Sequence, residues 1–156
     1  MGLLSELTYT HMEVFTALDA MERALSRARR SREDKAEVGA ILREVVPQAL
    51  LLRQRLKASF EREREHLYPR VRRIFGSEVE EIGGLKRYAD QILDQLDHFI
   101  DELPSTGEDR PHPVRLAYLA LLFDELAELY EMRTEIERRF YECYSTIVFP
   151  GGATTD

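Results

Sequence analysis

The chain has 156 residues, of which 44% are hydrophobic and 33% are charged, and its formal net charge is −7. This length suits a single domain, and the acidic balance argues against a general nucleic-acid binder, which needs a basic face. No stretch approaches the roughly 20 uncharged apolar residues of a membrane span, and the single Cys143 excludes an internal disulfide and fits a reducing compartment. The sequence therefore predicts one cytoplasmic domain over 1–150 and a disordered tail over 151–156, with neither nucleic acid nor membrane as a partner.

Apolar residues recur at helical spacing along almost the whole chain, and no segment alternates with the period of a strand. The first helix is expected from about 3 to 29. The second is expected from about 36 to 75, with Pro47 kinking or dividing it because proline lacks the backbone donor. Gly76 should end this helix.

The third helix is expected to follow a capping box at 77–80 and to run to about 103. The segment 104–113 contains three prolines and a glycine and predicts a loop, and the fourth helix should run from about 114 to 148. Amphipathic helices with short connections favour an all-α, up-down-up-down four-helix bundle.

Polar residues interrupt the apolar stripes, and each needs an explanation because an unpaired buried polar group is costly. On the first helix His11 lies within the inward arc, where it is either a hydrogen-bonded core histidine or a ligand. On the second helix, Glu63 and His66 are expected to share the inner face one turn apart, with Ser59 one turn below Glu63. The spacing Glu-x-x-His lets a carboxylate and an imidazole hold one metal ion, whereas the alternative is an exposed helix turn.

The fourth helix carries the third interruption, Arg133 and Glu137. Glu137 borders the apolar stripe and is a candidate metal ligand. Arg133 offers a different solution, a buried ion pair with Glu63 in place of a metal. The sequence contains no nucleophilic triad, phosphate loop or cysteine cluster, so it predicts that the protein is not an enzyme.

These placements resemble the hemerythrin-like (HHE cation-binding) family, whose members are four-helix bundles with a non-haem di-iron centre. The segment LTYTHMEVFTALDAMERAL resembles the family's opening helix, with His11 as its ligand histidine. The segment SFEREREHLYP resembles the second-helix motif, in which Glu63 takes the place of the bridging carboxylate. Ser59 stands where that family has a histidine, and the third and fourth helices have no histidine at the positions of the family's ligands.

The resemblance implies a regulatory protein that binds or senses iron or oxygen at an altered or partly lost site formed by His11, Glu63, His66 and Glu137. The iron centre would be di-iron or mononuclear, or lost altogether. The fourth-helix segment LYEMRTEIERRF and the chain length are also similar to small bacterial regulators of the Rsd/AlgQ type, which bind a sigma factor. A metal-free bundle that binds a partner protein is therefore the alternative, and both monomer and homodimer remain open.

Overall fold

The computed structural model describes residues 2–104 and 113–151, and this part of the chain is all-α, without strands. Its elements are α1 (Leu3–Arg30), α2 (Lys35–Arg62), a π-helical segment (Glu63–Leu67), α3 (Tyr68–Phe75), α4 (Glu80–Glu102) and α5 (Pro113–Val148). Most of the expected loop over 104–113 and of the expected tail over 151–156 lies outside the described residues.

The helix ends have local causes, some of which the sequence analysis identified. The Asp34 side chain caps α2 by accepting a hydrogen bond from the backbone N–H of Glu37 at 3.1 Å. Gly76 ends α3 as expected, with a left-handed φ of 78°. The expected capping box at 77–80 is wrong, because Val79 is the N-cap of α4 and no side chain caps that helix. Glu78 instead pairs with Arg72 and Lys86.

The expected long second helix is helical throughout, but its irregularity lies elsewhere than anticipated. Pro47 lies inside α2 without dividing it. The change in helical geometry comes sixteen residues later, at the π-helical segment Glu63–Leu67. Such wide turns within α-helices occur often at functional sites, so this segment is the first structural pointer to one.

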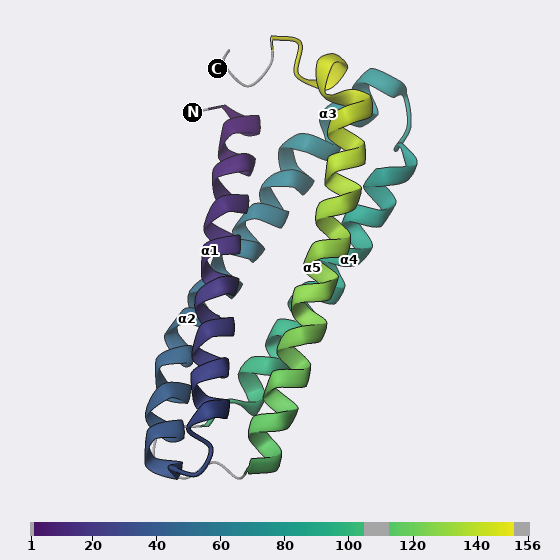
Figure 1. The fold of residues 1–156 in the computed structure, drawn as a ribbon. Helices are drawn as coiled ribbons and strands as arrows, with labels where there is room; N and C mark the ends of the chain where they lie inside the picture. Colours follow the sequence, from purple (N-terminus) through teal and green to yellow (C-terminus); the bar gives the residue numbers. More distant parts are fainter. Residues whose placement is uncertain (1, 105–112, 152–156) are drawn as a thin grey trace.

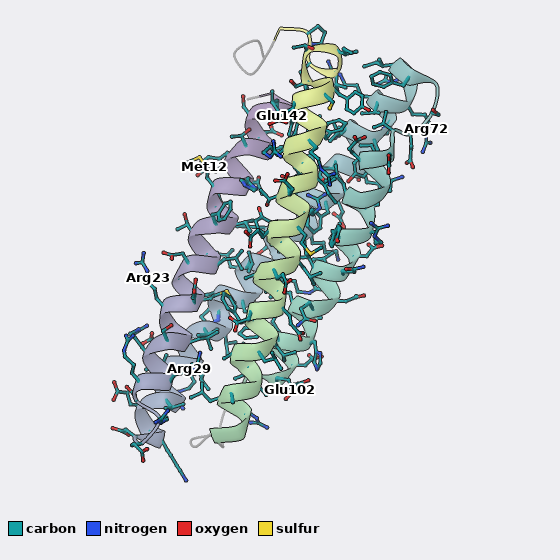
Figure 2. The ribbon with its side chains drawn as sticks, turned by 45° about the vertical axis from the view of Figure 1, so that its right-hand side comes forward. Met12, Arg23, Arg29, Arg72, Glu102 and Glu142 are labelled. Carbon is teal, nitrogen blue, oxygen red and sulfur yellow. The ribbon has the colours of Figure 1, made fainter. Side chains whose placement is uncertain are left out.

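The long helices lie lengthwise beside one another, and α3 lies at the same end as the start of α1 and the end of α5 (Figure 1). α1 packs along α2 and α4 packs along α5, whereas α1 and α5 approach each other much less closely. Charged side chains such as Arg23, Arg72 and Glu142 lie on the outside (Figure 2). No helix in the described ranges combines the length and the apolar character that crossing a membrane requires.

The apolar interior is divided into two clusters along the helix axes. The larger one is built on residues such as Val14, Leu56 and Leu126, and the smaller one on residues such as Leu7, Leu67 and Ile136. α1, α5 and the α2–α3 helical stretch each contribute residues to both clusters. Along each of them, a short interval of residues separates the last member of one cluster from the first member of the other. The polar interruptions of the stripes, His11, Glu63 and Arg133, fall in these intervals. We call these three residues and Glu137 the polar layer.

Candidate functional site: a buried arginine and its carboxylates

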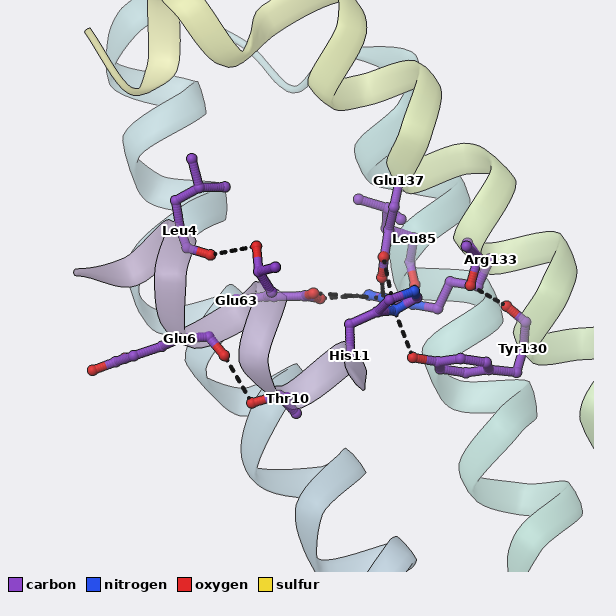
Figure 3. A network of polar contacts seen from close by, with 11 residues as sticks. Leu4, Glu6, Thr10, His11, Glu63, Leu85, Tyr130, Arg133 and Glu137 are labelled. Atoms are coloured by element: carbon purple, nitrogen blue, oxygen red, sulfur yellow. Dashed lines mark hydrogen bonds and ion pairs between the residues drawn. The ribbon is translucent and has the colours of Figure 1, made fainter. Parts of the chain in front are cut away.

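Arg133 is the centre of the polar layer, and its side chain is only 1% exposed. Its Nη2 donates to Oε2 of Glu63, which is also buried, and its Nη1 donates to Oε1 of Glu137 one helical turn further along α5. Nη1 also lies 3.5 Å from the second oxygen of Glu63. Figure 3 shows the guanidinium between the two carboxylates. The ion pair between Arg133 and Glu63 that the sequence offered as an alternative to a metal is therefore present.

Arg133 makes two further contacts, one with α4 and one with Phe60. Its Nε donates to the backbone carbonyl of Leu85 on α4 at 3.2 Å. Its guanidinium carbon lies 4.4 Å from the centre of the Phe60 ring, which adds a cation–π contact. Opposite charges satisfy a buried guanidinium only when hydrogen bonds accompany them, and here both conditions are met.

The π-helical segment explains how Glu63 is held. Its wider turn brings Tyr68, five residues after Glu63, back over the same side chain, and the Tyr68 hydroxyl donates to Glu63 Oε2 at 3.0 Å. Burial, together with the negative charge of Glu63, raises the pKa of Tyr68, so the hydroxyl keeps its proton. Oε2 of Glu63 therefore accepts hydrogen bonds from both Tyr68 and Arg133, which fix the position of this carboxylate.

The same wide turn contradicts the expected orientation of His66. In a regular α-helix, Glu63 and His66 would share a face, but in the π-helical segment Leu67 takes the buried position and His66 lies outside. The side chain of His66 is 56% exposed, and its ring nitrogen lies 3.9 Å from Glu65 rather than near Glu63. The structure does not bring His66 to the other three predicted ligands.

His11 does reach the polar layer, where it contacts a residue that the sequence analysis did not single out. Its Nδ1 lies 2.7 Å from the hydroxyl of Tyr130 on α5, and 3.8 Å from Oε2 of Glu137. Burial, and secondarily the charge of Arg133, lowers the pKa of His11. His11 is therefore a neutral imidazole that is hydrogen-bonded to a tyrosine, which matches the first of the two alternatives, a hydrogen-bonded core histidine.

Glu137 is the least satisfied member of the layer. Burial raises its pKa to about 7, with the opposing charge of Arg133 and the like charge of Glu63 as the next contributions. One guanidinium thus serves two carboxylates, and Glu63 is the more enclosed of the two. Near neutral pH, Glu137 can therefore exist in either protonation state.

A cavity of about 230 Å³ opens beside the polar layer between α1, α2 and α5. His11, Glu63, Arg133 and Glu137 contribute to its polar wall, together with Ser59, which stands where the resembled family has a histidine. Its apolar and aromatic lining includes Leu7, Val14, Leu56, Phe60, Tyr130 and Tyr141. The cavity thus combines charged and hydrogen-bonding groups with apolar and aromatic surface, a composition typical of small-molecule binding sites.

The residues present do not fit the metal centre that the resemblance implies. A metal ion between Glu63 and Glu137 would need the space and the carboxylate lone pairs that the Arg133 guanidinium takes, and two neighbouring cations would repel each other. Within residues 2–104 and 113–151, no three His, Cys, Asp or Glu side chains are placed so that they could hold one metal ion. His11, Glu63 and Glu137 meet around a guanidinium instead.

Two residues of the site were missed from the sequence, for different reasons. Tyr130 precedes Arg133 by three residues and Glu137 by seven, so helical spacing could have identified it as a member of the same face. Tyr68 follows Glu63 by five residues, which is not a spacing that shares an α-helical face. Only the π-helical segment makes that pair, and the sequence carries no clear signal for it.

Comparisons with known proteins leave the site to be interpreted from its own geometry. No family model, no curated protein and no solved structure matches this chain.

Proposed function

We propose that this protein is a metal-independent, non-catalytic binding protein with the up-down-up-down, hemerythrin-like bundle fold, in which the Arg133 guanidinium replaces the metal cation. The observation that supports this most directly is the set of bonds from Arg133 to Glu63, Glu137 and the Leu85 carbonyl. A permanently charged side chain fixed among the carboxylates supplies the positive charge that an ion would otherwise supply. We therefore favour the metal-free interpretation over iron or oxygen binding.

A metal-free bundle can act by holding a small molecule or by docking on another protein. The cavity beside the polar layer favours the first, because it is a concave site with apolar walls and a few convergent polar groups. A conformational response of α1 and α5 to an occupied cavity would give such a protein a regulatory role. The weak packing between these two helices supports that response.

Elemental analysis tests the metal-independent part of the proposal. The chain is produced in medium supplemented with iron, manganese and zinc and purified without a chelating tag. We expect far less than one metal equivalent per chain, and no change in thermal stability on adding a chelator. One equivalent of metal that disappears in Glu63→Ala would overturn the proposal.

The variant Arg133→His adds a positive test in the same experiment. It removes the guanidinium and leaves an imidazole near Glu63, Glu137 and His11, which together resemble an iron or zinc donor set. We expect this variant to retain more metal than the native chain. Arg73→His, on the exposed surface of α3 with no Asp or Glu three or four residues away along the chain, is the control and should not.

A further inference from the structure

We infer that the cavity between α1 and α5 is a binding site for a small organic cation, an amine with a compact apolar body, whose ammonium group pairs with Glu137. This inference rests on the proposed function, since it takes the polar layer to be free of metal.

The size of the cavity limits the ligand. Its volume is about 230 Å³. An enclosed protein cavity of about 150 Å³ accepts benzene, so a ligand of roughly ten non-hydrogen atoms fits this one. Drug-sized ligands usually occupy larger pockets, of about 300–1,000 Å³. The occupant is therefore a small metabolite-sized molecule rather than a peptide or a nucleotide.

The charge balance of the polar layer favours a cation. Glu63 and Glu137 carry two negative charges when ionised, and Arg133 supplies one positive charge. Oε1 of Glu137 accepts from Arg133, whereas for Oε2 the described residues provide only His11 Nδ1 at 3.8 Å, beyond hydrogen-bond length. Glu137 is one-fifth exposed and lines the cavity. One carboxylate oxygen facing the cavity is thus left for a ligand that donates a hydrogen bond.

An anion would bind less favourably than a cation in the same place. Arg133 already donates to two carboxylates and a backbone carbonyl. The other arginine of the lining, Arg138, is held by Glu135 and Glu142. An anionic group would therefore meet the carboxylates of Glu63 and Glu137 before it met an available guanidinium.

The remaining walls suit the apolar body of an amine. Val14, Leu56 and Phe60 offer hydrocarbon surface. The aromatic ring of Tyr130 stacks on the His11 imidazole, with 5.5 Å between the ring centroids, and adds aromatic surface to the cavity. A neutral apolar ligand would make these contacts but would cover the Glu137 oxygen without a partner, which is unfavourable.

Three probes that share one body test the inference: 2-phenylethylamine, 2-phenylethanol and phenylacetate, titrated into the full-length protein at pH 8 and followed by NMR chemical shifts and calorimetry. We expect the amine to bind at least about tenfold more tightly than the alcohol, the effect of one charge-assisted hydrogen bond, and phenylacetate to bind most weakly. Equal affinities for the three probes would overturn the assignment of a cation site. Absence of amine binding at millimolar concentration would overturn the ligand site itself.

Variants locate the effect within the cavity. Glu137→Gln should remove the preference for the amine over the alcohol, whereas Glu131→Gln, an exposed carboxylate on the same helix, should keep it. Ser59→Leu, on the opposite wall, should weaken all three probes by filling the cavity without altering its carboxylates. Retention of the amine preference in Glu137→Gln, or unchanged binding in Ser59→Leu, would contradict the inference.

Metal content measured on the same preparations separates the two proposals. A metal-free protein that does not bind the amine would refute this inference but not the proposed function. A protein that purifies with one metal equivalent per chain would refute the proposed function.

Discussion

Replacing Arg133 with methionine should destabilise the protein more than any other single change to a charged side chain of the polar layer. The substitution keeps much of the aliphatic length and removes the cation. Glu63 is 4% exposed and cannot recover hydration, whereas Glu137 is one-fifth exposed and partly can. Breaking a buried ion pair by removing one partner costs about 3–5 kcal/mol, and most of that cost should fall on Glu63. The total unfolding free energy of a small domain is about 5–15 kcal/mol, so this loss should be easily measured.

The assay is urea unfolding followed by circular dichroism at 222 nm, at pH 8 and again at pH 5. Burial already raises the pKa of Glu137, and without Arg133 the charge that opposes this rise is gone. The contribution of Glu137 is then retained at low pH and lost as the pH rises, so Arg133→Met should lose less stability at pH 5 than at pH 8. Arg138→Met is the control, because its partners Glu135 and Glu142 are exposed and surface pairs contribute little.

A double-mutant cycle with Glu63→Gln isolates the pair. Glutamine keeps an oxygen for the Tyr68 hydroxyl and removes the charge that Arg133 neutralises. The combined variant should be more stable than the sum of the two single changes predicts, by about 2 kcal/mol or more. Additive effects, or equal losses for Arg133→Met and Arg138→Met, would refute the description of Arg133 as the buried centre of this site.

Three further predictions concern other parts of the molecule. Burial raises the pKa of Glu137 to about 7. As the pH rises from about 4.5 to 7, the native chain should therefore lose up to about 3 kcal/mol of unfolding free energy relative to Glu137→Gln, measured by urea unfolding. Burial lowers the pKa of His11 from 6.5, so its contribution is present above pH 6.5 and lost below it. His11→Gln should therefore flatten that acid-side loss, and an unchanged profile would contradict the assignment. Gly83→Ala should raise the free energy of unfolding by about 0.5–1 kcal/mol, because alanine favours the helix more than glycine does and its added Cβ meets nothing within 4 Å. Gly84→Ala should gain less, or lose stability, because its Cβ would lie 3.0 Å from the Ile136 side chain.

The helices and the central ion pair were within reach of the sequence because both depend on the regular spacing of side chains. The stripe positions before and after the polar residues indicated that Glu63 and Arg133 face inward, and an ion pair between them was offered as the alternative to a metal ion. The orientation of His66 was wrong because it assumed α-helical spacing through a π-helical segment.

The polar layer itself raises the question of why a protein would keep charges between two apolar clusters. A buried ion pair is seldom worth more than well-packed apolar side chains of the same size, so stability alone does not explain it. One remaining role is to fix the register of the helices, and the other is to bind a ligand. The triple variant Arg133→Met, Glu63→Leu, Glu137→Leu distinguishes them.

If the layer fixes register, the triple variant should lose its single folded state, visible as collapsed amide dispersion in the NMR spectrum. If the layer serves a ligand, the variant should stay uniquely folded, with unfolding free energy equal to or above that of the native chain, and should lose its preference for the amine probe. The packing of the two apolar clusters on either side of the layer makes the second outcome our expectation. A poorly dispersed spectrum would instead assign the layer to fold specificity, and the amine site would then rest on the Glu137 variant alone.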